Sequence, residues 1–350
     1  MRKKAVGLIL LLAVIIFVGI AYTMKKEEKS QIKVSGYVGG EKIGFLEDEE
    51  VLSVLREDYG LSVDYAKAGS LDMMTADLEG KNYLFPSSSI ALEYYKELHG
   101  QPLQSEIMMN TPIVLYSRKM VVDALDAQGL ITIEGNVCYI DMRGLLKLIQ
   151  ENTSWADVGL SQLYGTVSVY TTDPCRSNSG NMFAALLANV LNDGETLTAE
   201  DTEEILPQLQ EIFGKLGYME DSSADLFNQF LKMGVGAMPM VAGYESQLIE
   251  YAAENPDEYE KIKEDLVMLY PIPTIWSSHV LIALDENGQK MITGLMDEEI
   301  QKLAWKRHGF RTETNGIGKD VGLSCVADSI TQVTQVPEYK VMREIFEVLE

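Results

Sequence analysis

The chain has 350 residues, of which 46% are hydrophobic and 23% are charged, and it contains no low-complexity tract. This composition is typical of a globular protein with one large or two medium domains, and it excludes a largely disordered chain. The formal net charge of −24 argues against a nucleic-acid partner, because binding to phosphates needs clustered Lys and Arg.

The N-terminal segment combines a basic run at residues 2–4 with an uncharged apolar stretch at residues 5–24. At about 1.5 Å per residue, such a helix just crosses a hydrocarbon core of about 30 Å. The basic residues favour a cytoplasmic N-terminus and an exported chain. A signal peptide is the alternative, since residues 19–21 fit a cleavage site. We expect residues 1–30 to be an uncleaved membrane anchor or signal segment with a linker, and the rest to lie outside the cytoplasmic membrane.

The three cysteines are Cys138, Cys175 and Cys325. No Cys-x-x-Cys or Cys/His cluster exists, so no metal site is predicted. An odd number leaves at least one thiol unpaired or linked to another molecule. Cys175 lies in a polar loop, where it is either a reactive thiol or a small apolar filler.

Strands alternate with helices in the first part of the chain. We expect a strand at 31–39, a helix at 46–60, a strand at 61–69 and a strand–turn–helix at 82–100. The acidic run at 47–50 suits the first turn of a helix, with calcium binding as the alternative. This alternation predicts βαβ units and a parallel sheet, and therefore an α/β fold.

A second α/β region follows an outgoing strand at residues 111–119. Later elements are expected as a helix at 141–159, a strand at 165–174, a helix after 177, a helix at 199–216, a helix then strand at 225–246, a strand region at 266–284 broken by prolines, and helices at 297–310 and 339–350.

Small polar loops precede helices at three places, namely residues 39–42, 87–89 and 177–180. Ser and Asn at these positions are favourable helix caps, which is a sufficient explanation for any one loop. Ligands of open α/β sheets also bind beyond the carboxyl ends of strands, at helix N-termini that favour anions. The repetition therefore suggests a ligand site without deciding it.

The order of these parts resembles the type 2 periplasmic-binding-protein fold of the extracellular solute-binding proteins of ABC transporters. The resemblance covers most of residues 31–350. It is carried by "VSGYVGGEK", "YLFPSSSIAL", "TPIVLYSRK", "DPCRSNSG" and "PMVAGYES" taken in order. It implies two α/β lobes joined by crossing hinge strands, with the first lobe at 31–114 plus 270–350 and the second at 115–269.

The resemblance also implies a ligand in the cleft between the lobes. Hydroxyls and backbone N–H groups from both lobes resemble oxyanion-binding members most, whereas His99, His279 and His308 are scattered. Arg176 and Lys42 are the candidates for a charge that clamps an anion, and the returning strand contributes Tyr244 or Glu245. The implied ligand-binding residues are Gly39, Gly40, Lys42, Ser87, Ser88, Ser177, Asn178, Ser179, Gly180 and Tyr244.

No catalytic motif accompanies these loops, since no G-x-S-x-G elbow is present and the serines at 177 and 179 have no nearby His in sequence. We therefore expect a solute-binding protein without catalysis or cofactor. Its partners would be a small-molecule ligand, a membrane permease for ABC-type uptake, and the membrane itself through residues 5–24. The alternatives are a membrane-anchored sensor or interaction protein with the same fold and, third, an enzyme built on that fold.

Overall fold

The computed structural model describes residues 31–217 and 219–350. Within those residues, no helix has the length and apolar character needed to cross a membrane. The anchor or signal segment expected within residues 1–30 lies outside the described residues, so it stays a prediction.

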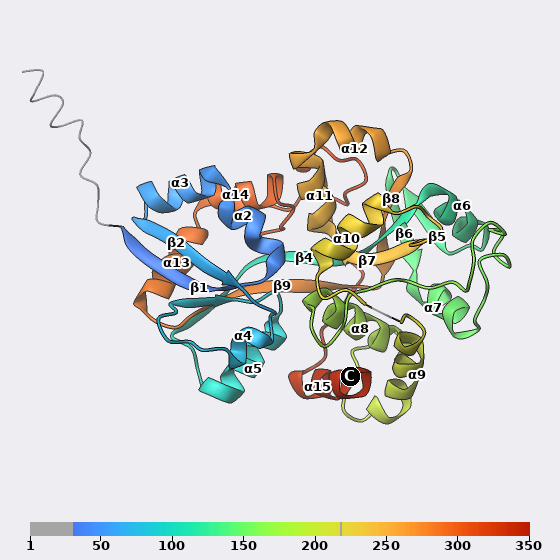
Figure 1. Cartoon of the computed structure of the whole chain (residues 1–350), viewed down its shortest axis with the longest axis horizontal. Coiled ribbons are helices and arrows are strands. Elements are labelled where there is room, and N and C mark those ends of the chain that lie inside the picture. The colour runs from blue at the N-terminus through green and yellow to red at the C-terminus, as the bar shows by residue number, and fades with distance from the viewer. Residues whose placement is uncertain (1–30, 218) are drawn as a thin grey trace, which may run out of the picture.

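Two groups of elements lie side by side in Figure 1, and we name them the first and second lobe. The first lobe contains β1 (Ile32–Val38), η1 (Gly40–Lys42), α2 (Ile43–Glu47), α3 (Glu49–Glu57), β2 (Leu61–Lys67), α4 (Asp72–Thr75), β3 (Tyr83–Phe85), α5 (Ser89–His99), α13 (Glu286–Leu295) and α14 (Glu298–Lys306). Its parallel neighbours β2, β1 and β3 form the predicted βαβ arrangement.

The second lobe is larger and more helical. It contains α6 (Lys119–Ala127), β5 (Ile131–Glu134), β6 (Val137–Asp141), α7 (Met142–Gln150), α8 (Asn178–Leu191), α9 (Thr202–Gly214), α10 (Ser223–Lys232), β7 (Met240–Tyr244), α11 (Glu245–Glu254), α12 (Pro256–Ile262), β8 (Leu266–Ile272) and α15 (Tyr339–Leu349). The segment η2 (Gly318–Val321) lies between α14 and α15 in sequence.

Two long strands run between the lobes, β4 (Gln104–Arg118) and β9 (Thr274–Ala283) (Figure 1). The first part of β4 pairs antiparallel with β9, up to Pro112 opposite Trp276. From Ile113 onward β4 pairs with β7 and β8 instead. One strand thus belongs to the sheets of both lobes, and the whole forms a mixed sheet in the order β2-β1-β3-β9-β4-β8-β6-β5, with β7 paired to β4 and β10 (Val333–Thr334) paired to β9.

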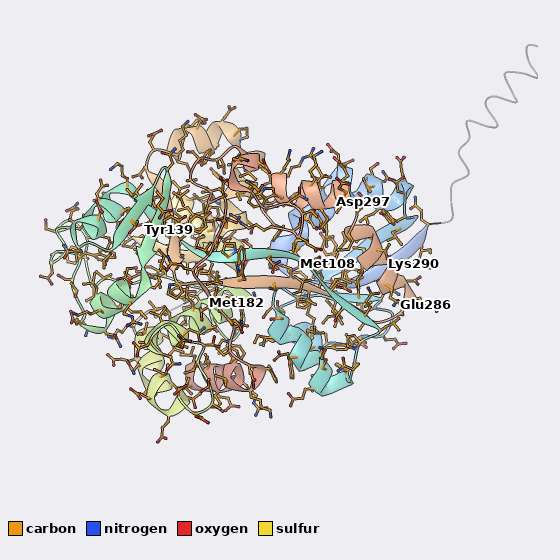
Figure 2. All side chains as sticks on the ribbon, turned by 180° about the vertical axis from the view of Figure 1, so that it is seen from behind. Met108, Tyr139, Met182, Glu286, Lys290 and Asp297 are labelled. Atoms are coloured by element: carbon orange, nitrogen blue, oxygen red, sulfur yellow. The ribbon has the colours of Figure 1, made fainter. Side chains whose placement is uncertain are left out.

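Each lobe has its own apolar core. Met108, labelled in Figure 2, lies in the core of the first lobe, whereas Met182 of α8 lies in that of the second. Helix α8 is buried over almost its whole length, because sheet strands and helices α7, α9 and α15 surround it. Burial on all sides explains its run of Ala, Leu, Phe and Val without a polar face.

Residues 48–50 of the acidic run form the start of α3, which is one of the two interpretations expected, whereas Glu47 ends α2. The Asp48 carboxylate accepts hydrogen bonds from the backbone N–H groups of Glu50, at 2.8 Å, and Val51, at 3.3 Å. Glu49 and Glu50 then occupy the first turn of α3, where negative charge is favourable.

Three expected elements differ in the structure. The helix expected at 141–159 ends at Gln150, and turns follow. The segment expected as a strand at 165–174 makes only isolated bridges, for example from Tyr170 to Val241. The last helix, α15, packs on α9 and α8, and Val341 and Met342 lie in the core of the second lobe. The lobe boundaries expected from the sequence assign residues 270–350, and therefore this helix, to the first lobe.

Candidate functional site

A cavity of about 570 Å³ is lined by loops from both lobes. The first lobe contributes residues that follow β1 and β2, and the second lobe contributes the start of α8 and the segment before α10. The lining residues are Gly39, Gly40, Glu41, Lys67, Ala68, Gly69, Ser70, Asp72, Arg176, Ser177, Asn178, Asp221, Ser222 and Ser223.

The register of the sheet explains why the first-lobe loops meet. Strands β1 and β2 are parallel, and their last residues, Val38 and Lys67, lie opposite each other. The loops that follow therefore leave the same edge of the sheet, which is where α/β folds bind ligands. Gly39 allows a close approach here, because a Cβ at this position would lie 2.5 Å from a Glu41 carboxylate oxygen and 2.7 Å from Ser87 Oγ.

Behind this loop lies a buried charged cluster made of Glu41, Lys42, Ser87 and His279. Lys42 Nζ donates to the Glu41 carboxylate and, over 2.7 Å, to Ser87 Oγ. The same ammonium lies 3.2 Å from His279 Nδ1. Ser87 Oγ also donates to Glu41. Lys42 and His279 are fully buried, whereas the Glu41 side chain is 11% exposed and borders the cavity.

Burial and the contacts within the cluster shift the pKa values of its members. Burial alone would raise the pKa of Glu41, but Lys42, His279 and the hydrogen bonds from Lys42 and Ser87 outweigh it and lower that pKa to about 2. Burial lowers the pKa of Lys42, and Glu41 opposes the shift. Burial and then the charge of Lys42 lower the pKa of His279 to about 3. At neutral pH Glu41 is therefore an ionised carboxylate and His279 a neutral imidazole.

His279 has one nitrogen that the cluster leaves without a partner. Because an ammonium can only donate, Nδ1 accepts from Lys42 and Nε2 carries the ring proton. Within residues 31–217 and 219–350, His279 Nε2 is one of three buried side-chain atoms without a hydrogen-bond partner, and Asn178 Oδ1 is another.

Asn178, the first residue of α8, joins the lobes. Its Nδ2 lies 3.0 Å from the backbone oxygen of Ser87, 2.9 Å from Tyr244 Oη and 3.1 Å from Ser277 Oγ. These partners come from the first lobe, the end of β7 and the crossing strand β9. Asn178 therefore holds the two predicted polar loops directly against each other.

The predicted serines differ in what they do. Ser88 is the N-cap of α5, and its Oγ accepts from Ile90 N over 3.1 Å. Ser177 occupies the N-cap position of α8, yet its side chain makes no capping bond and borders the cavity. Ser179 Oγ is 2.7 Å from Thr172 Oγ1 and 3.1 Å from Ser177 Oγ.

Two further predicted residues have structural surroundings. Gly180 packs against backbone atoms of Thr172 and Asp173, so a Cβ would not fit there. Tyr244 is buried, and its hydroxyl contacts Asn178 rather than the cavity. Its neighbour Glu245 is fully buried and accepts two hydrogen bonds of 2.7 Å from Arg311, which places it in an internal ion pair.

The structure thus separates the ten predicted residues into two sets. Gly39, Gly40, Ser177 and Asn178 line the cavity. The remaining six lie outside its lining: Lys42, Ser87, Ser88, Ser179, Gly180 and Tyr244. Lys42 and Ser87 remain one layer behind the cavity, joined to it through Glu41.

The cavity carries charges of both signs. Arg176, one of the two expected anion clamps, has a side chain that is 68% exposed and lies 3.5 Å from Asp221. Lys67 extends beside Gly40, where a Cβ would be 3.2 Å from its ammonium. Among the described residues, no group of three or more His, Cys, Asp or Glu side chains could hold a metal ion.

Sequence reasoning missed several lining residues. Glu41 lies between two predicted residues, but an acidic side chain did not fit an anion-binding loop. Gly69 and Ser70 follow β2 just as Gly39 follows β1, so the same strand–loop rule would have found them. No sequence pattern indicated Asp221, because its segment reaches the cavity only through the packing of the second lobe.

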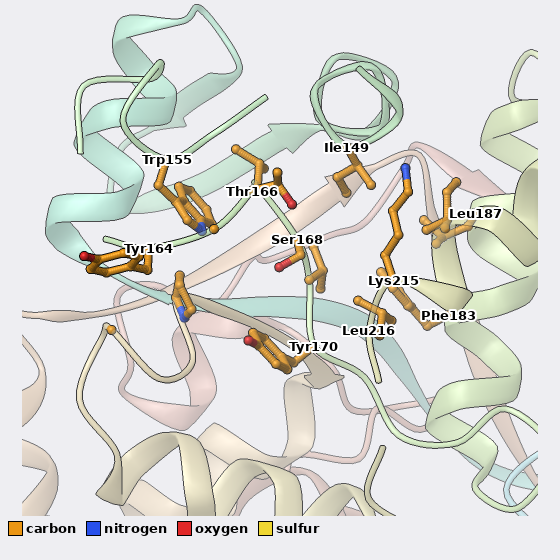
Figure 3. Close-up of a pocket in the computed structure, with 16 residues that line it drawn as sticks. Ile149, Trp155, Tyr164, Thr166, Ser168, Tyr170, Phe183, Leu187, Lys215 and Leu216 are labelled. Carbon is orange, nitrogen blue, oxygen red and sulfur yellow. The ribbon is translucent and has the colours of Figure 1, made fainter. Parts of the chain in front are cut away.

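A second cavity, of about 220 Å³, lies inside the second lobe (Figure 3). Trp155, Phe183 and Leu187 contribute apolar surface to it, and Lys215 extends along one side. None of the ten predicted residues lines it. It is separate from the cavity between the lobes.

Solved structures share this fold. The sulfate-binding protein SubI from Mycobacterium tuberculosis H37Rv matches with a TM-score of 0.57 at 12% identity, covering 90% of this chain and 96% of that chain. The substrate-binding protein of an ABC transporter from Agrobacterium tumefaciens matches with a TM-score of 0.55 at 13% identity, covering 93% and 96%. An ABC transporter structure from Clostridium perfringens matches with a TM-score of 0.56 at 10% identity, covering 90% and 98%.

These similarities establish a type 2 periplasmic-binding-protein-like fold, as the resemblance implied. At such identities they concern the fold and leave the ligand open. Comparison with protein-family models gave no match, and comparison with curated proteins gave none either.

Proposed function

We propose that this protein is an extracytoplasmic solute-binding protein that holds a small polar solute between its lobes. The observation that carries the proposal is the cavity of about 570 Å³ lined by both lobes at the carboxyl edge of β1 and β2. A solute in this position would contact the two lobes at once. Binding would then favour a closed arrangement about the crossing strands β4 and β9.

The lining favours a ligand with several hydrogen-bonding groups, and the start of α8 in the second lobe favours an oxyanion in particular. Ser177 stands at the start of a helix of fourteen residues without capping it, so the N–H groups of the first turn lack that side-chain partner. Arg176 and Lys67 add positive charge. We assign direct ligand contact to Gly39, Gly40, Ser177 and Asn178, and a supporting position to Lys42, Ser87 and Tyr244.

The proposal places the chain in ABC-type uptake, with delivery of the solute to a membrane permease. The fold is that of ABC-transporter binding proteins. The apolar stretch at residues 5–24 would keep the protein at the outer face of the membrane. The proposal includes no catalytic step.

A thermal-shift screen of the full-length protein against anions, sugars and amino acids tests the proposal. A solute present at about 100 times its Kd adds about 2.7 kcal/mol of stability and raises the melting temperature measurably. Asn178→Ala should reduce this shift, whereas the matched variant Asn181→Ala should keep it, because Asn181 lies outside the cavity lining and donates to the carbonyls of Pro174 and Ser177. A solute that stabilises both variants as well as the parent would contradict the cavity assignment.

A further inference from the structure

The Glu41 carboxylate accepts hydrogen bonds from the donors that the first lobe could otherwise offer to an anion. One of its oxygens, Oε1, accepts hydrogen bonds from Lys42 Nζ and Ser87 Oγ. The same oxygen lies 3.5 Å from His279 Nδ1. We name Lys42 Nζ and Ser87 Oγ the anion seat, because an ammonium and a hydroxyl are the donors that hold an oxyanion in proteins.

Lys42 needs a negative partner in this position. Its side chain is fully buried, and its ammonium lies 4.9 Å from the centre of the Phe85 ring. Burying an unpaired charge is strongly unfavourable. Glu41 is the carboxylate within 4.0 Å of this ammonium in the part of the chain that the structure describes. The positive charge of Lys42 in the anion seat is therefore neutralised by the Glu41 carboxylate.

Glu41 also lies where a ligand would reach the seat. It borders the cavity between the lobes, whereas Lys42 and Ser87 lie behind it. Gly39 lets this carboxylate and Ser87 Oγ lie close against the backbone, since a Cβ there would be 2.5 Å from Glu41 Oε1 and 2.7 Å from Ser87 Oγ. A solute that enters the cavity therefore meets Glu41 before it meets the seat.

We propose that Glu41 determines the specificity of the cleft by acting as a resident carboxylate on the anion seat, so that an oxyanion must displace it to bind there. This inference rests on the proposed function. It means that the parent protein selects against simple oxyanions at this seat. Only a ligand whose contacts with both lobes outweigh the loss of the Glu41 contacts reaches Lys42.

The surroundings leave room for the displaced side chain. Gly40 and Glu41 border a further cavity, of about 290 Å³, on the side of Gln247 and Glu250. On the other side, the Lys67 ammonium lies next to Gly40. A carboxylate that left Lys42 would therefore have this cavity and the Lys67 ammonium near it.

Glu41→Gln in the full-length protein tests this inference, with inorganic sulfate as the probe in isothermal titration calorimetry at constant ionic strength. The substitution keeps the size of the side chain and removes its charge. Losing a charged competitor for two donors should tighten sulfate binding by about tenfold to a hundredfold relative to the parent. Asp72→Asn is the matched control, because it removes one negative charge from the same cavity and changes nothing on Lys42.

A second variant keeps the test decisive. Glu41→Gln combined with Lys42→Met removes both charges and should bind sulfate no better than the parent. If Glu41→Gln folds only when sulfate is present, as circular dichroism would show, sulfate has replaced the missing counter-ion and the inference holds. It fails if sulfate neither binds nor restores folding in Glu41→Gln, or if Asp72→Asn gains as much affinity.

The proposed function is judged separately, by the solute screen on the parent protein. A parent that binds a screened solute while Glu41→Gln gains no affinity for sulfate would keep the function and overturn the role of Glu41. If Glu41→Gln gains affinity for sulfate and the added change Ser177→Ala leaves that gain unchanged, the result would support the anion seat. It would contradict binding between the two lobes.

Discussion

Asn178 Nδ2 in the second lobe lies 3.0 Å from the backbone oxygen of Ser87 in the first, so two polar loops separated by 91 positions in sequence are in direct contact. The contact links the lobes at the mouth of helix α8. It also shows that the second-lobe loop donates a hydrogen bond to the first-lobe loop.

Replacing Asn178 with Ala should loosen this contact. Loss of its hydrogen bonds is expected to lower the free energy of unfolding by about 1–2 kcal/mol. It should also increase the radius of gyration in small-angle X-ray scattering, because the lobes lose a link across the cavity. Asn181→Ala, which removes hydrogen bonds to the carbonyls of Pro174 and Ser177 within the second lobe, should leave the radius unchanged. Equal radii for the two variants would rule out a linking role for Asn178.

Ser88 and Ser177 are expected to behave differently although sequence reasoning gave them the same role. Ser88→Ala removes the cap of α5 and should reduce stability by about 1 kcal/mol with little effect on solute affinity. Ser177→Ala removes no capping bond and should weaken the binding of the screened solute instead. Chemical denaturation and calorimetry separate the two effects, and a Ser88→Ala variant with normal stability but weak binding would reverse the assignment.

The lowered pKa of Glu41 predicts a pH dependence of stability. Folding lowers this pKa from 4.5 to about 2, so the protonated form is favoured more in the unfolded chain than in the folded protein. The stabilisation is complete above pH 4.5 and is lost as the pH falls toward 2. His279, whose pKa is lowered to about 3 by burial and then by the charge of Lys42, also titrates in this range.

Acid unfolding of the parent and of Glu41→Gln measures this contribution. The difference in unfolding free energy between the two proteins should shrink steadily from pH 4.5 toward pH 2, because the variant has no carboxyl group to titrate at this site. A difference that stays constant over this range would show that Glu41 is not held as a buried anion.

Arg311 and Glu245 form a buried ion pair between the segment that follows α14 and the start of α11. Glu245 begins α11, and Arg311 pairs with Asn110 of β4 through the backbone. Because both side chains are buried, Arg311→Ala should destabilise the protein by about 3–5 kcal/mol. The double variant Arg311→Met with Glu245→Leu should recover much of this loss in denaturant titrations. A double variant less stable than the single one would contradict an ion pair that acts as a unit.

Cys175 is expected to react slowly. Burial and then the negative charge of Asp173 raise the pKa of its thiol to about 11, so little thiolate exists at neutral pH. All three cysteines are free in the structure. Alkylation by iodoacetamide followed by peptide mass spectrometry should therefore label Cys175 well below the rate of a small thiol, and rapid labelling at pH 7 would support the reactive alternative.

The α/β class and the edge that carries the site could be predicted from sequence, because they follow from local rules. Strands such as 31–39 and 61–69 alternate with helices, and parallel strands place the loops after them at one edge. The acidic start of α3 was equally readable, since Asp48 caps the helix that its neighbours extend.

The cluster behind the cavity could not be predicted in the same way. His279 is 237 positions from Lys42, and their contact depends on how β9 returns beside the first lobe. Nor does a Gly-Gly-Glu-Lys run indicate which of its charged side chains faces inward. The fate of residues 165–174 likewise depends on which strands are available to pair with them, and that is a property of the whole second lobe.

The central claim is that a solute binds between the lobes, and hydrogen–deuterium exchange of the full-length protein tests it most directly. With the solute found by the screen, the account predicts slower exchange in both residues 39–41 and residues 176–178, because closure protects the two loops together. Protection confined to one lobe, or centred on the Trp155 cavity, would contradict it.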